Sequence, residues 1–233
     1  MDTKTTQNLA NDGGMVELNK KQNASKNSWV WGVLLFAVLI LIDQVTKIAA
    51  EIYFCAEGAP EQIVVIPGWV NLCITFNRGI SYGMGSGASP ELKLAVIAAT
   101  GVMMVILAVL FFKTDQRRTL LRVAFVFIVA GGIGNFIDRM YYQVWDPASA
   151  STLPNVADGV RDMVDISRLG FAVCNFADFF ISAGAVMLVL ALLFFDSTAI
   201  FPVGKKYKQL AEEERQKEEA KEAAKQAKRQ ENK

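Results

Sequence analysis

Carboxylates, carboxamides, lysine and arginine are the groups of this 233-residue chain considered for catalysis, because the sequence contains no histidine. The absence of histidine excludes Ser-His-Asp and Cys-His nucleophiles and histidine-based zinc sites. The three cysteines, Cys55, Cys73 and Cys174, are too few and too scattered for a disulfide scaffold or a CxxC metal site. Any chemistry must therefore come from carboxylates, amides, lysine or arginine.

Acidic residues occur in two short motifs in the second half of the chain. RDMVD contains Asp162 and Asp165, and NFAD places Asn175 and Asp178 one helical turn apart at the start of an apolar segment. Two close carboxylates can share a proton, so that one acts as general base toward water and the other polarises a scissile carbonyl. These motifs predict an aspartic hydrolase that needs no metal. A helix dipole also favours an acid at its N-terminus, so a structural role for Asp178 stays open.

Further polar residues lie within or at the ends of apolar segments, where an ionisable group costs about 2.5–3.5 kcal/mol. Asp43 and Lys47 are four residues apart and share one helix face, which predicts an ion pair. The stretch GGIGNFIDR places Asn135, Asp138 and Arg139 on one face, and its glycines allow close helix approach. We expect Asp138 and Arg139 to belong to a charged network that holds other groups in place.

Four apolar blocks must position these residues. The chain is 52% hydrophobic and 20% charged, and its mean hydropathy is +0.28. The blocks cover about 29–50, 92–112, 120–138 and 176–195, and at about 1.5 Å per residue they predict four membrane-spanning helices. The fold class is therefore an all-α membrane protein. A net charge of +1 argues against a nucleic-acid partner.

Two long connections separate the predicted spans. In 51–91, the runs QIVVIP and WVNLCITF favour a small β-sheet at the outer membrane surface. The second connection, 140–175, is rich in Asp, Ser and Pro and longer than an ordinary loop, so it is either functional or partly mobile. Basic residues concentrate in the two termini and the short loop, which predicts that these lie in the cytoplasm and the two long connections outside.

The two ends of the chain are polar. Residues 1–28 are predicted to form a disordered cytoplasmic leader, followed by a membrane domain over 29–196. Residues 197–233 are predicted to form a charged cytoplasmic tail, a solvated helix with Glu–Lys pairs at i,i+4 spacing. A docking role for this tail is a structural alternative.

A transporter would use the same intramembrane carboxylates along an ion or proton pathway. The acids, however, are expected at one membrane interface rather than at the midplane, and the four spans show no inverted repeat. These two features favour the hydrolase and leave a small ion- or proton-coupled transporter as the alternative.

Five motifs together resemble the lipoprotein signal peptidase (signal peptidase II) family over roughly residues 30–196. They are DQVTK (43–47), FNRGISYG (76–83), GGIGNFIDR (131–139), RDMVD (161–165) and NFADFFI (175–181). The resemblance implies a four-helix aspartic endopeptidase of the bacterial inner membrane. Such an enzyme removes the signal peptide from prolipoproteins just before a diacylglyceryl-modified cysteine, at the periplasmic face.

The resemblance also assigns roles to individual residues. It implies that Asp162 and Asp178 are catalytic. It implies supporting roles at eight positions: Asp43, Lys47, Asn77, Gly134, Asn135, Asp138, Arg139 and Asn175. It implies no cofactor and no metal, with lipid-modified prolipoproteins and membrane lipid as partners, and a monomer suffices for the chemistry.

The chain departs from the family pattern in three places. An insertion within 141–160 precedes the first acidic motif, Arg161 replaces a small apolar residue, and Cys174 stands where an aromatic residue is usual. Because the insertion disturbs the alignment, Asp165 remains an alternative to Asp162 as the first catalytic acid.

Overall fold

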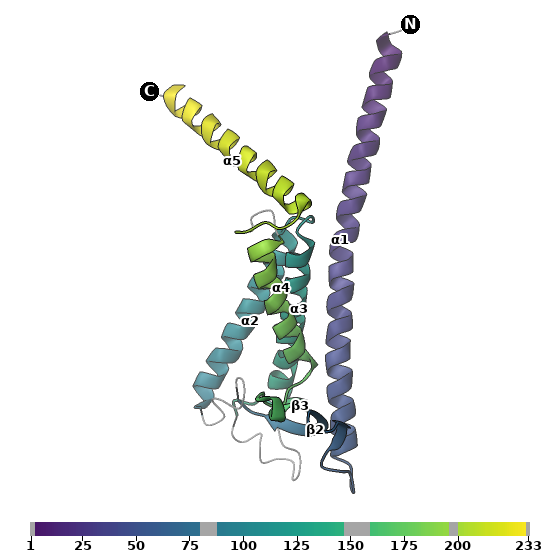
Figure 1. The fold of residues 1–233 in the computed structure, drawn as a ribbon, viewed down its shortest axis with the longest axis vertical. Coiled ribbons are helices and arrows are strands. Elements are labelled where there is room, and N and C mark those ends of the chain that lie inside the picture. The colour runs from purple at the N-terminus through teal and green to yellow at the C-terminus, as the bar shows by residue number, and fades with distance from the viewer. Residues whose placement is uncertain (1–2, 80–87, 147–158, 196–199, 232–233) are drawn as a thin grey trace.

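Four long apolar helices form the body of the molecule. The computed structural model describes residues 3–79, 88–146, 159–195 and 200–231. Each helix contains a segment long and apolar enough to cross a membrane (Figure 1): α1 Thr3–Phe54, α2 Pro90–Lys113, α3 Thr119–Tyr141 and α4 Phe176–Phe194. The predicted all-α membrane fold with four spans is confirmed.

Helix α3 lies at the centre of this bundle and packs against α1, α2 and α4. Two glycines permit the close approach of α3 and α4. A Cβ on Gly131 would collide with the carbonyl oxygen of Ala177, and a Cβ on Gly184 would lie 2.9 Å from the backbone nitrogen of Ile128. Within a bilayer no hydrophobic force drives helices together. Small residues at such crossings therefore stabilise the bundle by letting the helix backbones pack closely.

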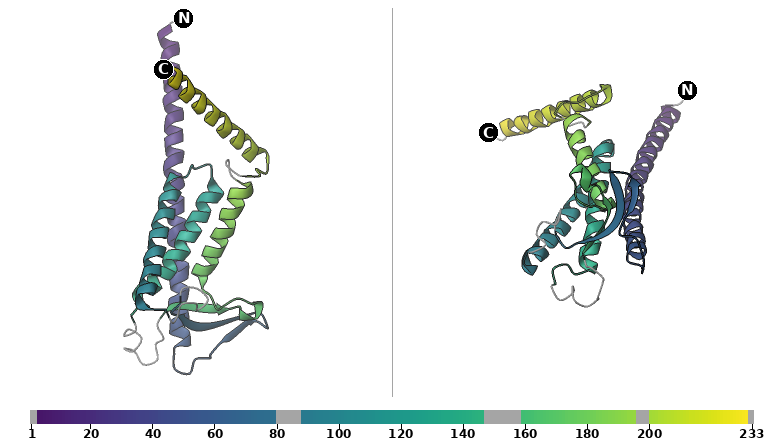
Figure 2. Two further views of the ribbon diagram at one scale, coloured as in Figure 1. Left: turned by 90° about the vertical axis from the view of Figure 1, so that its left-hand side faces the viewer. Right: turned by 60° about the horizontal axis from the view of Figure 1, so that its bottom comes forward.

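A three-stranded antiparallel sheet lies at one end of the bundle, in the order β1-β2-β3 (Figure 2). Strands β1 (Ile63–Ile66) and β2 (Val70–Asn77) come from the first connection, as predicted. Strand β3 (Val160–Asp165) comes from the second connection and pairs with β2, with Thr75 opposite Asp162. The sheet therefore joins the two connections over the end of the helices.

The segment after β3 folds back on the strand before α4 begins. A 3₁₀ turn, Ser167–Leu169, is followed by Gly170, whose φ of +84° favours glycine. Cys174 then pairs with Val164, with backbone hydrogen bonds of 2.8 Å and 3.0 Å in the two directions. This return places the first turn of α4 beside β3.

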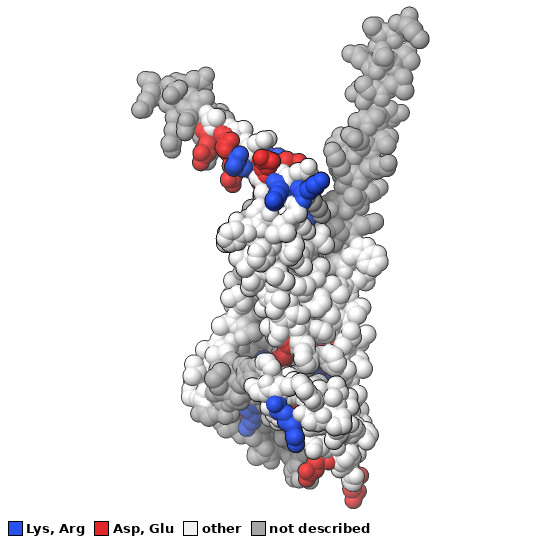
Figure 3. Space-filling model, in the orientation of Figure 1, with Lys and Arg blue, Asp and Glu red and all other residues white. Residues whose placement is uncertain are grey.

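The terminal segments are helical where the structure describes them. Helix α1 begins at Thr3, which differs from the disordered leader predicted over 1–28. Adding turns to an existing helix avoids the cost of nucleation, so a polar segment can continue a stable span. The tail forms α5, Lys205–Glu231, with an i,i+4 pair of 3.5 Å between Arg215 and Glu219. Charged side chains of both signs cover the described part of α5, whereas the visible face of the helical bundle carries few charged side chains (Figure 3).

Parts of two predicted features lie outside the described residues. They are residues 80–83 of the FNRGISYG motif and residues 147–158 of the insertion within 141–160.

Candidate active site

Asp162 on β3 and Asp178 in the first turn of α4 are linked by two carboxamides. Asn175 donates from Nδ2 to Oδ1 of Asp162 at 2.6 Å, and Asn135 donates from Nδ2 to Oδ1 of Asp178 at 2.8 Å. The two amides also contact each other, because Asn175 Nδ2 lies 3.1 Å from Asn135 Oδ1. The structure thus brings together residues of β3, α3 and α4 that are far apart in the sequence.

Asp178 also caps α4. Its backbone N–H donates to Oδ1 of Asn175 at 3.1 Å, and Asn175 returns a hydrogen bond from its own N–H to Oδ2 of Asp178 at 3.1 Å. This reciprocal capping box is the structural role that the sequence left open. The capping box engages Oδ2 of Asp178 and leaves Oδ1 to accept from Asn135. The cap thus orients the carboxylate toward a polar cluster made up of the two acids and the carboxamides of Asn77, Asn135 and Asn175.

The pKa of Asp162 is raised to about 7. Burial is the main cause, since the residue is only 4% exposed, and repulsion from Asp178 adds to it. Hydrogen bonds from Asn175 and Asn77 oppose this rise. Near neutral pH the side chain of Asp162 is therefore divided between its protonated and ionised forms.

Asn77 reaches Asp162 from the end of β2. Its Nδ2 donates to Oδ2 of Asp162 at 3.3 Å, and its Oδ1 accepts the N–H of Gly79 at 2.8 Å. Gly159 packs against the backbone of Asn77 with a φ of +151°, and an added Cβ would lie 2.7 Å from the Asn77 carbonyl carbon. The turn and this close approach fix the amide that faces Asp162.

A buried lysine orients the carboxamides from behind. Lys47 Nζ lies 2.9 Å from Asp43 Oδ2, 3.4 Å from Asp138 Oδ2 and 2.9 Å from Asn135 Oδ1. Because Oδ1 of Asn135 accepts from Lys47 and from Asn175, its Nδ2 is left to donate toward Asp178. The ion pair predicted from the spacing of Asp43 and Lys47 is confirmed.

Asp43 ties α1 to the other two helices of the site. Its Oδ1 accepts the backbone N–H of Ala177 at 2.9 Å, and so fixes the first turn of α4. Gly134 leaves the space that this contact needs, because a Cβ there would lie 2.5 Å from Oδ2 of Asp43. The neighbouring Gln44 donates to Oδ2 of Asp43 at 3.0 Å and to the carbonyl of Gly134 at 3.1 Å.

The sequence does not predict that Arg161 belongs to the charged network around Asp138. Its guanidinium lies 2.7 Å from Asp138 and 3.1 Å from Glu51, and its backbone N–H donates to Asp138 at 3.0 Å. Tyr142 completes this arrangement by donating from its hydroxyl to Glu51 at 2.9 Å. The signal was present in α1, since Glu51 continues the four-residue spacing of Asp43 and Lys47 on one helix face.

Asp138 contacts Lys47 and Arg161 and interacts electrostatically with Arg139, so it belongs to a charged network, as the sequence predicts. Arg139 also interacts electrostatically with Asp178 and Asp162. It is a nearby cation for both acids.

Asp165 lies apart from this cluster. Its carboxylate accepts the N–H of Ser167 at 2.9 Å and the side-chain amide of Asn71 at 3.4 Å. Hydrogen bonding from Ser167 holds the pKa of Asp165 below its ordinary value. Among the described residues, then, the carboxylate that meets Asn175 and Asn77 is that of Asp162.

The described ranges contain no group of three or more cysteine, aspartate or glutamate residues placed to hold a metal ion. The polar cluster is a hydrogen-bonded set of two acids, amides and buried ion pairs. Its geometry suits acid–base catalysis by the two carboxylates.

Two curated proteins illustrate the similarity of the chain to known sequences. The lipoprotein signal peptidase of Bifidobacterium longum (strain DJO10A) is 33% identical over 159 residues, or 67% of this chain and 75% of that protein. The lipoprotein signal peptidase of Fusobacterium nucleatum is 28% identical over 165 residues, or 70% of this chain and 87% of its own length.

Solved structures also resemble the chain. Two structures described as a bacterial membrane enzyme, determined by the in meso method, match with a TM-score of 0.52 and 26% identity. They cover 70% of this chain and 87% and 92% of their own chains. A family model for signal peptidase (SPase) II matches residues 35–194, well over half of the sequence. This chain belongs to the signal peptidase II family.

Proposed function

We propose that Asp162 and Asp178 are the catalytic dyad with which this membrane aspartic peptidase removes signal peptides from prolipoproteins. The family has this activity, and the comparisons lend no support to a transporter. The observation that carries the proposal is the pair of carboxamides, Asn175 and Asn135, each donating to one of the two acids within 2.8 Å. Such donors align two carboxylates on one reaction centre without taking up their remaining lone pairs.

The two acids divide the work according to their surroundings. Asp162, whose pKa is raised to about 7, holds the shared proton and donates it toward the scissile carbonyl oxygen. Asp178 is the general base: it takes a proton from water as the water oxygen attacks the carbonyl carbon. The gem-diol then collapses as Asp178 gives its proton to the amide nitrogen, the C–N bond breaks, and Asp162 recovers a proton from the diol.

The supporting residues are assigned positioning roles. Lys47, with Asp43 and Asp138, fixes the orientation of Asn135. Asn77 holds Asp162 from the sheet side. Arg139 offsets the charge of the dyad. The dyad and these groups all come from one chain, so a monomer is sufficient.

The substrate is a prolipoprotein whose cysteine already carries a diacylglyceryl group, and cleavage occurs just before that cysteine. The acyl chains supply about 0.8 kcal/mol per buried CH₂, so an unmodified cysteine makes a poor substrate. The site at the sheet end of the bundle is where such a lipid and its peptide arrive together from the membrane.

The protein is assigned to the bacterial inner membrane with both termini in the cytoplasm and the sheet in the periplasm. Basic residues support this orientation, because Lys113, Arg117, Arg118 and Arg122 gather at the end opposite the sheet, and the sequence holds ten more Lys and Arg residues in 204–233.

Cleavage of a diacylglyceryl-modified prolipoprotein by the purified protein tests the dyad. We expect Asp162→Asn and Asp178→Asn each to lower the rate by at least about 10²–10⁴-fold, the usual contribution of a general acid or base. Asp165→Asn is the matched control, an acid on the same strand outside the cluster, and should keep nearly full activity. A dead Asp165→Asn beside an active Asp162→Asn would overturn the assignment.

A further inference from the structure

Arg161 lies directly before Asp162 on β3, and its side chain is held between two helices. Its guanidinium lies 2.7 Å from Oδ1 of Asp138 on α3 and 3.1 Å from Oε2 of Glu51 on α1. It also donates to Oε1 of Gln44 on α1 at 3.3 Å. Because successive residues of a strand point to opposite faces, these contacts hold β3 from the side opposite to the Asp162 carboxylate.

The main chain of Arg161 is tied to the same helix, α3. Its N–H donates to Oδ2 of Asp138 at 3.0 Å, so both oxygens of this carboxylate accept from one residue. One turn earlier on α3, Asn135 donates to Asp178 at 2.8 Å. A single helix thus fixes both the strand that carries Asp162 and the amide that holds Asp178. A displacement of β3 relative to α3 would therefore change the separation of the two acids.

A tyrosine closes these contacts into a clamp of four residues: Arg161, Asp138, Glu51 and Tyr142. Tyr142 donates from its hydroxyl to Oε1 of Glu51 at 2.9 Å, so both oxygens of Glu51 are engaged. The guanidinium carbon of Arg161 lies 5.6 Å from the centre of the Tyr142 ring. The same ring meets Phe76, the residue of β2 opposite Arg161, edge-on with centres 6.0 Å apart. The clamp therefore joins α1, the end of α3 and two strands of the sheet.

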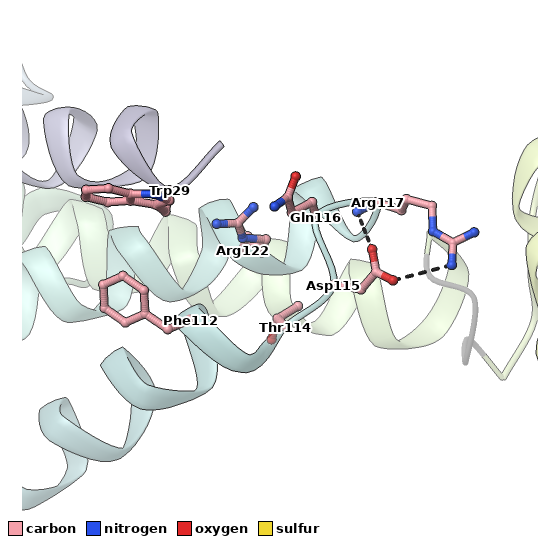
Figure 4. A pocket seen from close by; sticks show the side chains of 7 residues that line it. All are labelled: Trp29, Phe112, Thr114, Asp115, Gln116, Arg117 and Arg122. Atoms are coloured by element: carbon pink, nitrogen blue, oxygen red, sulfur yellow. Dashed lines mark hydrogen bonds and ion pairs between the residues drawn. The ribbon is translucent and has the colours of Figure 1, made fainter. Parts of the chain in front are cut away.

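Burial holds this clamp in one geometry. The side chain of Arg161 is only 7% exposed. Arg117, at the opposite end of the bundle, provides the contrast: it lies 3.3 Å from Asp115, but about half of each side chain is exposed (Figure 4). Water screens such an exposed pair, which contributes little. A buried guanidinium that bridges carboxylates of two helices is instead fixed in direction as well as in position.

We propose that Arg161 is a positioning residue for the dyad, which holds β3 against α1 and α3 and so sets the separation of Asp162 and Asp178. The inference rests on the proposed function, because this separation matters to cleavage only if the two acids are catalytic. A misplacement of about 1 Å can cost about 10²-fold in rate. Loss of the clamp should therefore lower kcat. KM should change little, because the buried side chain of Arg161 lies on the other face of the strand from the dyad.

The protonation of Asp162 reports the position of β3. Charged and titratable groups of the neighbouring elements act on its carboxyl: Lys47, Cys73, Arg139, Cys174 and Asp178. Burial raises the pKa of both thiols, so they are uncharged near neutral pH. Burial, and then repulsion from Asp178, raise the pKa of Asp162. Both effects weaken if β3 moves away, so this pKa should fall, and the decline of cleavage with rising pH should begin at a lower pH.

Steady-state cleavage of a diacylglyceryl-modified prolipoprotein by the full-length protein, measured from acidic to alkaline pH, tests the clamp. In Arg161→Met we expect kcat to fall about 10- to 100-fold. KM should change less than about twofold, and the pH at which cleavage declines should fall by at least about 0.5 unit. Arg161→Lys retains the charge but not the planar fork, so kcat should still fall at least about threefold. Glu51→Gln weakens one end of the clamp and should lower kcat about two- to threefold.

Arg168→Met is the matched control, because Arg168 is an exposed arginine just after β3 and outside the clamp. It should keep the wild-type kcat and pH profile. Thermal unfolding in detergent gives the folded fraction of each variant, so that kcat is compared per folded molecule. A loss of stability alone would not move the pH at which cleavage declines. Wild-type kcat and pH profile in Arg161→Met, beside an inactive Asp162→Asn, would overturn the clamp and leave the dyad standing.

Three further outcomes would also overturn the positioning role. Full activity in Arg161→Lys would show that a positive charge is sufficient. A shift of the decline to higher pH in Arg161→Met would indicate the loss of a nearby cation rather than a displaced strand. If the Arg161 variants do not fold, wild-type kcat and pH profile in Glu51→Gln would overturn the clamp. Cleavage by Asp162→Asn would instead refute the proposed dyad itself, and the clamp with it.

Discussion

The two ends of the helical bundle both place charges next to apolar segments, but they do so in different ways. At the sheet end, Asp43, Lys47 and Asp138 are fully buried, and the Lys47 ammonium lies within 3.4 Å of both carboxylates. At the opposite end, Arg117 and Asp115 form a pair that is about half exposed. Buried charges that share partners fix a geometry, whereas an exposed pair is screened by water and adds little. The comparison supports our proposal that the chemistry takes place at the rigid sheet end.

The largest effect is expected on removing the cation of the buried network. Lys47→Met leaves Asp43 and Asp138 buried without this counter-charge and removes the hydrogen bond that orients Asn135. We expect a loss of about 3–5 kcal/mol in the free energy of unfolding. Thermal or denaturant unfolding in detergent measures the stability, and prolipoprotein cleavage should be lost as well. A variant with wild-type stability would show that the network does not hold the helices together.

Substitution of Arg161 tests the same buried network at the sheet end, with a smaller expected effect on stability. Arg161→Met removes the contacts to Asp138 and Glu51 but leaves Lys47 beside Asp138, so we expect a loss of about 1–3 kcal/mol. Glu51→Gln weakens the same contact between Glu51 and Arg161. The double variant should therefore lose less unfolding free energy than the sum of the losses in the two single variants. Strict additivity would mean that the bridge of 3.1 Å between Arg161 and Glu51 contributes nothing. The measurement is a double-mutant cycle: the free energy of unfolding of the wild type, the two single variants and the double variant.

The smallest effect is expected at the solvated tail. Arg215→Gln breaks the pair with Glu219, and both side chains are more than two-thirds exposed. We expect a change in helix stability of about 0.5 kcal/mol or less and no change in cleavage rate. A large loss of activity would instead support the docking role for α5 that the sequence left open.

The sequence predicted what depends on local spacing. The four spans, the pair of Asp43 with Lys47 and the proximity of Asn175 to Asp178 all follow from helical periodicity. The spacing in GGIGNFIDR already places Asn135 with Asp138 on one helix face, and the resemblance to a family adds Asn77 to the expected cluster. The structure brings both amides beside the two acids. The polar leader was expected to be disordered because its composition contains no signal for continuing the first span.

Contacts between distant segments could not be predicted in this way. Arg161 meets Glu51 across 110 positions. The spacing in α1 places Glu51 on the face of Asp43 and Lys47, but it does not indicate which distant residue Glu51 contacts. The choice between Asp162 and Asp165 depends on the register of β3 against β2, which places Thr75 opposite Asp162 and Asn71 opposite Asp165. The return of Cys174 onto Val164 brings α4 into place, and it uses backbone hydrogen bonds that any residue could form.

In the proposed dyad, two neighbouring carboxylates share a proton, with Asp162 as the acid. Titration of the carboxyl carbons of ¹³C-aspartate-labelled protein measures this directly, with Asp162→Asn and Asp165→Asn to assign the signals. We predict that Asp162 titrates with an apparent pKa of about 7. In Asp178→Asn this pKa should fall, because the repulsion from Asp178 is removed.

The rate of prolipoprotein cleavage should follow the same titration. Deprotonation of Asp162 removes the proton offered to the carbonyl oxygen, so the rate should decline as the pH rises through about 7. Titration of Asp162 near 4, unchanged by Asp178→Asn and without effect on cleavage between pH 6 and pH 8, would contradict the shared-proton dyad.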